Sequence, residues 1–270
     1  MPTLVRSRHA AARRVLILPL MLVAVSGCDI ITADFKSTES SEWRKTYQLQ
    51  PGGSVEVSNV NGRIEVQSSP GNTVEIVAIK TAKGATSEAA KAALDRIEIV
   101  EDANAAGVRV ETRMQRGGGM FHVSGGGEVR YIVKVPPSAE VRFTNINGGI
   151  ELAGLAGRVN AATTNGGVRA RDIAGPIDAS ATNGGVDVEL ARVAAGGVKL
   201  ECTNGGIKLR LPADAKATIS ASITNGGIDA EGLSLDTSES SRRQLEGRLN
   251  GGGPSIRIRG TNGGIRLGVR

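Results

Sequence analysis

Apolar and polar residues alternate along the second half of the chain, in blocks that repeat around a Thr-Asn-Gly-Gly-(Val/Ile) motif. The side chains six and four residues before each motif asparagine are apolar, and the positions between them hold charged, polar or small residues. The alternation resumes after the glycines, with apolar residues three and five positions beyond the asparagine. A period of two is typical of a strand with one buried face. Each block therefore predicts two short strands joined at an Asn-Gly-Gly corner.

The spacing of these corners is that of a repeat protein. From Asn147 to Asn262 the asparagines are 18, 18, 21, 21 and 37 residues apart, and the last step fits one coil with an insertion. The segment Val55–Val66 has the same design, so one coil also opens the first half. We expect the corner asparagines to stack as a ladder of side-chain amides. They are Asn61, Asn147, Asn165, Asn183, Asn204, Asn225 and Asn262.

Two folds fit this pattern. One is an antiparallel meander with a hairpin at each Asn-Gly, and the other is a parallel β-solenoid with coils about 4.8 Å apart. The charged residue four positions after each asparagine favours the second, because its sign alternates along the chain. These residues are Glu151, Arg169, Asp187, Lys208, Asp229 and Arg266. Coils stacked in sequence order would place opposite charges side by side, at roughly 0.2–1 kcal/mol per contact. We therefore predict an all-β, parallel β-solenoid with 18–21 residues per coil.

Asn and Gly suit the corner because both tolerate positive φ. We expect the second glycine of each motif to allow close approach of the neighbouring coil.

The first half, residues 47–140, predicts a β region continuous with the repeat solenoid of residues 141–270, as one domain. Strand-like runs occupy 73–79, 97–100, 108–112 and 129–135. A single short helix is predicted from Ser87, its N-cap, to about Ile97. The glycine-rich segment Arg116–Gly127 predicts a loop between two strands, and a binding loop is the alternative.

Residues 1–27 predict a secretory signal peptide, with arginines followed by an apolar run. Val25-Ser26-Gly27-Cys28 resembles the lipobox of bacterial lipoproteins, which implies acylation of Cys28 and attachment to a membrane. An ordinary signal peptide or an uncleaved anchor is the alternative. Asp29 resembles an inner-membrane retention signal, although the outer membrane stays open. Residues 28–46 are polar and predict a lipidated tether, or alternatively a first strand packed on the solenoid.

Charge does not indicate a nucleic-acid partner. The chain has 33 basic and 27 acidic residues, but four of the basic ones lie in the signal peptide. The remaining 29 basic residues leave a net charge of about +2, without a one-signed row of side chains.

The residue inventory also gives little support to catalysis. Beyond the signal peptide the sole histidine is His122, and Cys202 has the inward parity of its strand. A usual zinc site needs three or four such ligands, so we expect neither a metal nor another cofactor. A β-helix enzyme acting on glycans would need clustered carboxylates and aromatic side chains. The candidate carboxylates are Asp172, Asp178, Asp187 and Glu189. The chain has six aromatic residues and none after Phe143, so we predict that it is not an enzyme.

The order of motifs resembles a known family. A lipobox precedes a Val-x-Val-x-Asn-x-Asn-Gly coil, Val135-Pro136, repeated Thr-Asn-Gly-Gly-Ile coils, Leu211-Pro212 and a closing repeat. This arrangement, from about Tyr47 to Arg270, resembles a bacterial envelope β-strand-repeat family called adhesins, a domain of unknown function. The resemblance implies a β-solenoid without catalytic residues. We expect an exported, lipid-anchored structural or interaction module with an envelope protein or glycan as partner. A glycan-acting enzyme and a sensory or regulatory envelope lipoprotein remain as alternatives.

Overall fold

The computed structural model describes residues 37–115 and 127–270. The predicted signal peptide, Cys28, Asp29, His122 and most of the glycine-rich loop lie outside the described residues. Among the described residues, no helix is long and apolar enough to cross a membrane.

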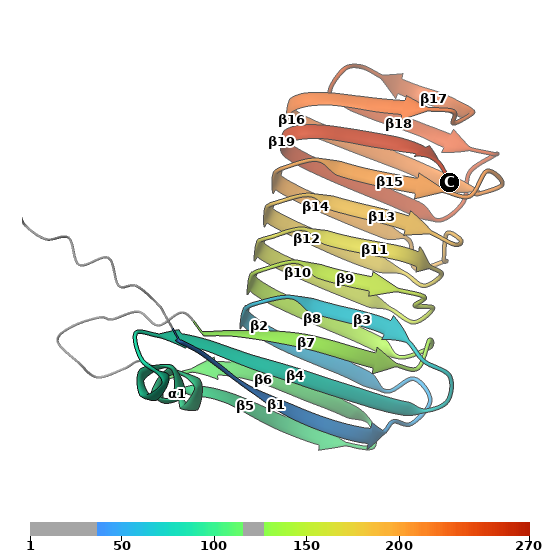
Figure 1. Cartoon of the computed structure of the whole chain (residues 1–270). Helices are drawn as coiled ribbons and strands as arrows, with labels where there is room; N and C mark the ends of the chain where they lie inside the picture. Colours follow the sequence, from blue (N-terminus) through green and yellow to red (C-terminus); the bar gives the residue numbers. More distant parts are fainter. Residues whose placement is uncertain (1–36, 116–126) are drawn as a thin grey trace, which may run out of the picture. The chain divides into compact units, whose positions relative to one another are not determined.

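The repeats form a parallel β-solenoid, as predicted, in which each coil gives one strand to each of two faces (Figure 1). The first face contains β8 (Glu140–Asn147), β10 (Val159–Asn165), β12 (Ile177–Asn183) and β14 (Val198–Asn204). The second face contains β9 (Ile150–Ala153), β11 (Val168–Ile173), β13 (Val186–Leu190) and β15 (Ile207–Leu211). Successive strands of a face pair in parallel, with asparagine beside asparagine. The apolar rows fill the space between the faces, and Val188, Leu200 and Leu209 are fully buried.

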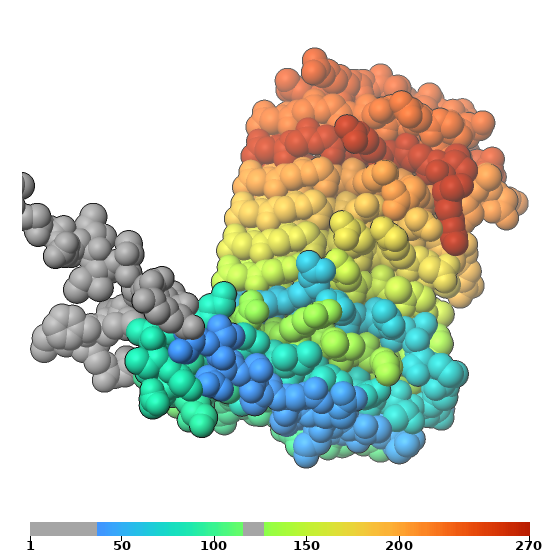
Figure 2. Space-filling view, viewed as in Figure 1, coloured from blue at the N-terminus to red at the C-terminus, as the bar shows by residue number. Residues whose placement is uncertain are grey.

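The last coils do not stack in sequence order. The C-terminal part consists of β16 (Ala217–Glu231), β17 (Leu235–Ser240), β18 (Gln244–Leu249) and β19 (Ser255–Val269). The closing strand β19 pairs with β14 and β15 on one side and with β16 on the other. Its red band lies between paler orange and deeper orange bands in Figure 2. The predicted contact between Lys208 and Asp229 is therefore wrong, because Arg266 lies between them, whereas Asp187 does lie beside Lys208. β18 pairs antiparallel with the outer edge of β16, which leaves the inner edge for β19.

The coil that comes first in the sequence is likewise not the outermost layer at its end of the stack. Its strands, β2 (Ser54–Asn61) and β3 (Ile64–Ser68), pair with β8 and β9 on one side. On the other side they pair with β6 (Gly107–Met114) and β7 (Gly127–Val135). Antiparallel strands then cover this end. They are β4 (Thr73–Gly84) on β7, and β5 (Ile97–Asn104) on β6.

The predicted tether is wrong over its second part. Residues Ser37–Gln48 form β1, which pairs antiparallel with β4 along its whole length. Alternate residues of β1, among them Trp43 and Tyr47, are half-buried, and these two aromatic rings pack against the core. The polar composition of β1 misled the prediction because only one face of this edge strand is partly covered.

The single predicted helix is present as α1 (Ser87–Asp95). Its N-cap is Thr86 rather than Ser87, and the Thr86 hydroxyl accepts a hydrogen bond from the Ala89 amide at 3.2 Å. Ala90 and Leu94 are buried, and the helix packs on β4 and β1. It ends before Ile97 because that residue begins β5.

Candidate binding groove

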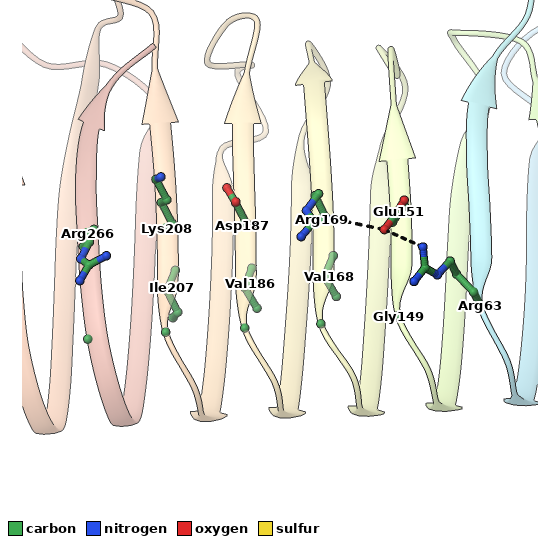
Figure 3. Close-up of a pocket in the computed structure, with 14 residues that line it drawn as sticks. Arg63, Gly149, Glu151, Val168, Arg169, Val186, Asp187, Ile207, Lys208 and Arg266 are labelled. Carbon is green, nitrogen blue, oxygen red and sulfur yellow. Dashed lines mark hydrogen bonds and ion pairs between the residues drawn. The ribbon is translucent and has the colours of Figure 1, made fainter.

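An open groove with a volume of about 610 Å³ crosses the second face beside the corners. It runs along the stack from the coil of Arg63 to that of Arg266, so that successive coils each supply part of its surface (Figure 3). Its floor is made by the second glycine of five motifs, Gly149, Gly167, Gly185, Gly206 and Gly264. Charged side chains two residues beyond these glycines form its wall, which Figure 3 shows projecting from neighbouring strands.

The glycines of the floor are not those that permit the close approach of coils. The first glycine of each corner has positive φ, and a Cβ on Gly205 would lie 2.1 Å from the Gly184 carbonyl oxygen. The second glycine has no left-handed φ, and its Cβ would lie farther from the next coil, 3.0 Å from a carbonyl oxygen at Gly167, 3.2 Å at Gly185 and 3.5 Å at Gly206. The closest approach of the coils is therefore at the first glycine and not, as predicted, at the second. The fold requires the first glycine far more strictly than the second.

Arg63 stands where the other coils have the second glycine, in the sequence Asn61-Gly62-Arg63-Ile64. Its side chain is exposed at one end of the groove, and its guanidinium lies 3.3 Å from a Glu151 carboxylate oxygen. A large side chain is thus compatible with this corner position. Glycine in the following coils leaves the floor open.

The carbonyl groups of the floor are already paired. The carbonyl oxygens of Gly167, Gly185 and Gly206 accept hydrogen bonds of 2.9 Å from the amides of Ile150, Val168 and Val186. These carbonyl groups are therefore used by the fold, and the charged side chains of the wall are the polar groups that project into the groove.

The charged wall is partly paired. Along the stack it reads Glu151, Arg169, Asp187, Lys208 and Arg266, and Arg63, from the corner position before β3, reaches Glu151 at its end. Glu151 lies 3.3 Å from Arg169 as well as from Arg63, and Asp187 accepts a 3.1 Å contact from Arg210. Because β19 lies next to β15, the alternation of sign breaks where Lys208 meets Arg266. Within the described part of the chain, neither of these two cations has a carboxylate oxygen within 4.0 Å.

The corner asparagines lie beside the groove and do not line it. Their side chains form one continuous ladder, in which each Nδ2 donates to the Oδ1 of the preceding coil at 2.7–2.9 Å. Its spatial order is Asn61, Asn147, Asn165, Asn183, Asn204, Asn262 and Asn225. Each amide thus has its partner within the row.

Cys202 faces inward at the corner, as its parity predicted. It is buried and free, and its thiol donates to the Gly184 carbonyl oxygen at 3.0 Å. Thr163 makes the same contact with Gly148, at 2.9 Å. Burial raises the pKa of the Cys202 thiol, which opposes formation of a reactive thiolate. This side chain is a structural donor at the corner.

The carboxylates considered for catalysis form ion pairs with Arg or Lys side chains. Arg210 contacts Glu189 at 3.2 Å in addition to Asp187, and Arg270 joins Glu189 at 3.1 Å to Asp172 at 3.4 Å. Asp178 lies on the first face, away from these three, with Lys199 at 3.4 Å. Across residues 37–115 and 127–270, no three His, Cys, Asp or Glu side chains form a cluster able to hold a metal ion.

Sequence reasoning missed the groove, although one signal of it was available. The second glycine has the same outward parity as the charge two residues later, so a row of such glycines predicts a bare strip beside the charged row. Arg63 is the position that marks the end of that strip.

Three solved structures resemble this chain at low sequence identity. A candidate cell adhesion protein from Clostridium sporogenes is 11% identical with a TM-score of 0.48, covering 85% of this chain and 100% of that one. A candidate adhesin from Bacteroides fragilis is 11% identical with a TM-score of 0.37, covering 85% and 97%. A candidate lipid-binding protein from Parabacteroides distasonis is 11% identical with a TM-score of 0.25, covering 84% and 97%. No curated protein matches the chain.

The match to a family model is extensive. The model described as Toastrack DUF4097, a domain of unknown function, matches residues 52–268. These residues include every coil and the antiparallel strands at both ends of the stack, but not β1. The chain belongs to the Toastrack DUF4097 family.

Proposed function

We propose that the protein is a lipid-anchored, non-catalytic interaction module of the bacterial cell envelope. In this proposal Cys28 carries the acyl chains, and the solenoid presents its groove to an envelope protein or glycan. The observation that carries the interaction role is the open groove across several coils, with a polar wall and a floor of glycines that the fold requires less strictly than the first glycine of each corner. The lipobox-like sequence before Cys28 supports the anchor.

The groove is better suited to binding than to glycoside hydrolysis. A general acid in such enzymes lies in an apolar environment, paired with a second carboxyl group across the scissile bond. Glu151 instead faces two guanidinium groups, and Asp187 faces a third. These contacts fix the carboxylates as part of an ion-pair row.

Acylation can be tested by labelling with a clickable palmitate analogue in cells that express the full chain. We expect wild-type protein and the Cys202→Ser control to be labelled and to sediment with membranes, whereas Cys28→Ser should lose the label. Label on Cys28→Ser, or unlabelled wild-type protein in the soluble fraction, would contradict the anchor. A density gradient then separates inner from outer membranes, and Asp29 predicts the inner one.

The absence of catalysis is tested with purified full-length protein in detergent. Incubation with envelope glycans should release no new reducing ends or unsaturated products, as followed by chromatography and absorbance. Product release that is lost on changing Glu151 or Asp187 to the matching amide would favour an enzyme instead.

A further inference from the structure

We infer that the groove binds an extended glycan that carries an acidic group, with Lys208 and Arg266 as the recognition point for its oxyanion. This inference deepens the proposed function by naming the ligand class and the site. It rests on the groove, on two adjacent cations without an ion pair within 4.0 Å among the described residues, and on the paired carbonyl groups of the floor.

The two cations provide the anion site. Lys208 and Arg266 occupy matching positions on the adjacent strands β15 and β19, and both side chains are exposed at one end of the groove. Like charges on adjacent strands destabilise a sheet. Asp187 and Asp229 lie on the strands that flank this pair, but neither carboxylate is within 4.0 Å of the two cations, so they offset the repulsion only in part. A carboxylate or phosphate between them would relieve this repulsion, and the planar guanidinium can bind either group with two hydrogen bonds.

The rest of the wall limits what else such a ligand can carry. Glu151 and Asp187 lie farther along the same groove, so a polymer with a negative charge on every unit would meet repulsion there. Hydroxyl groups can donate to these carboxylates and accept from Arg169 and Arg63. A ligand with many hydroxyls and few anionic groups therefore matches the wall.

The floor favours a glycan over a peptide. A peptide lying along the groove would need partners for its own backbone amides and carbonyls. The floor carbonyls already accept hydrogen bonds from the adjacent coil, as the 2.9 Å bond from the Val168 amide to Gly185 shows, so the amides of a peptide would find these acceptors occupied. The groove also crosses six strands of the second face, a span of about 24 Å at roughly 4.8 Å per step. This length accommodates several sugar rings in a row.

Isothermal titration of the full-length protein in detergent tests the inference. The probes are a maltooligosaccharide oxidised to carry one terminal carboxylate, the same oligosaccharide carrying one phosphate, the neutral maltooligosaccharide, and single-stranded DNA as a uniform polyanion. We expect one of the two acidic glycans to bind and the neutral glycan and DNA to bind at least about tenfold more weakly. The stronger acidic probe identifies whether the recognised oxyanion is a carboxylate or a phosphate.

Three variants locate the site. Lys208→Gln combined with Arg266→Gln should weaken binding by about tenfold or more, since charge-assisted hydrogen bonds are lost. Arg257→Gln is the matched control, because Arg257 is an exposed arginine of the same strand on the first face. Gly206→Gln keeps all charges and fills the floor, so it should also abolish binding while the melting temperature stays within about 2 °C.

Several results would overturn the inference. These are no binding of either acidic glycan at millimolar concentration, equal binding of DNA, or equal losses in the Arg257→Gln control. Acylation of Cys28 and absence of turnover are measured separately, so the proposed function can stand when this site fails. Conversely, glycan binding that depends on Lys208 and Arg266 in a protein without acyl chains would reject the anchor and keep the groove.

Discussion

The two adjacent glycines of a corner differ in how much room their surroundings leave for a side chain. Gly205 has φ of 152° and its missing Cβ leaves room for the Gly184 carbonyl, whereas Gly206 has neither constraint. The preference for Asn-Gly at a corner could be predicted from the tolerance of positive φ. Which glycine meets the next coil could not, because that depends on how the peptide planes of two coils face each other. For the same reason, the groove was not predicted from the sequence.

The two positions give a matched test. Gly205→Ala should lower the free energy of unfolding by about 1–3 kcal/mol, since it combines a strained φ with a clash against backbone. Gly206→Ala should change it by less than about 0.5 kcal/mol, because its Cβ makes an ordinary contact. Chemical denaturation of both variants measures the difference. Equal losses would show that both glycines are required by the fold.

The burial of Tyr131 predicts that the protein loses stability at alkaline pH. It is fully buried, its hydroxyl lies 2.7 Å from Thr112 Oγ1, and burial raises the pKa of Tyr131 to about 12. The pKa in the unfolded chain is about 10. The neutral side chain therefore stabilises the fold fully below about pH 10, and this contribution is lost as the pH rises through about 12, at about 1.4 kcal/mol per pH unit.

The measurement is the melting temperature between pH 8 and pH 12. Tyr131→Phe should be less stable than wild type at pH 8, because Thr112 loses its partner. The gap should narrow or reverse by pH 12. Parallel curves for wild type and Tyr131→Phe would refute this role.

Among the strands, position in the stack decides how a surface charge contributes. The alternating apolar pattern predicted the strands, the buried rows and the parallel register well, because period two leaves one choice of buried face. The order of the last coils was not predicted. It depends on β18 pairing with the outer edge of β16, and β18 carries no corner motif.

This order changes which charge reversal should destabilise the solenoid. Arg169 lies between Glu151 and Asp187, so Arg169→Glu places three acidic side chains in a row. It should lower the free energy of unfolding by up to about 1 kcal/mol at low salt. Lys208→Asp is the control: it meets Asp187 on one side and Arg266 on the other, so its effects offset each other.

Denaturation in low salt and in 1 M NaCl checks both variants, because salt should shrink the cost of Arg169→Glu. A larger loss for Lys208→Asp than for Arg169→Glu would contradict the observed order of coils.

In the described unit as a whole, β19 packs between β14 and β15 on one side and β16 on the other, and so joins the middle repeats to the C-terminal strands. Ile258 is fully buried and lies between Leu200 of β14 and Ala221 of β16. Ile258→Ala should cost about 2–5 kcal/mol and should loosen β14 and β15 together with β16 and β18. Hydrogen exchange followed by mass spectrometry resolves these segments.

Leu245→Ala in β18 is the comparison, since Leu245 pairs with Ala221 at the outer side of β16. Its loss of protection should stay within β16, β17 and β18. If Ile258→Ala loosens β19 alone, then the stack does not open as a coupled unit.

Both ends of the solenoid interlock coils from distant parts of the sequence, whereas from β8 to β15 each coil lies on the one before it. Whole repeats can therefore be gained or lost in that middle stretch without rearranging either end. Duplicating residues 159–176, one 18-residue step, should give a protein longer by about 4.8 Å. The length of the molecule is thus an adjustable trait, set by the number of middle repeats.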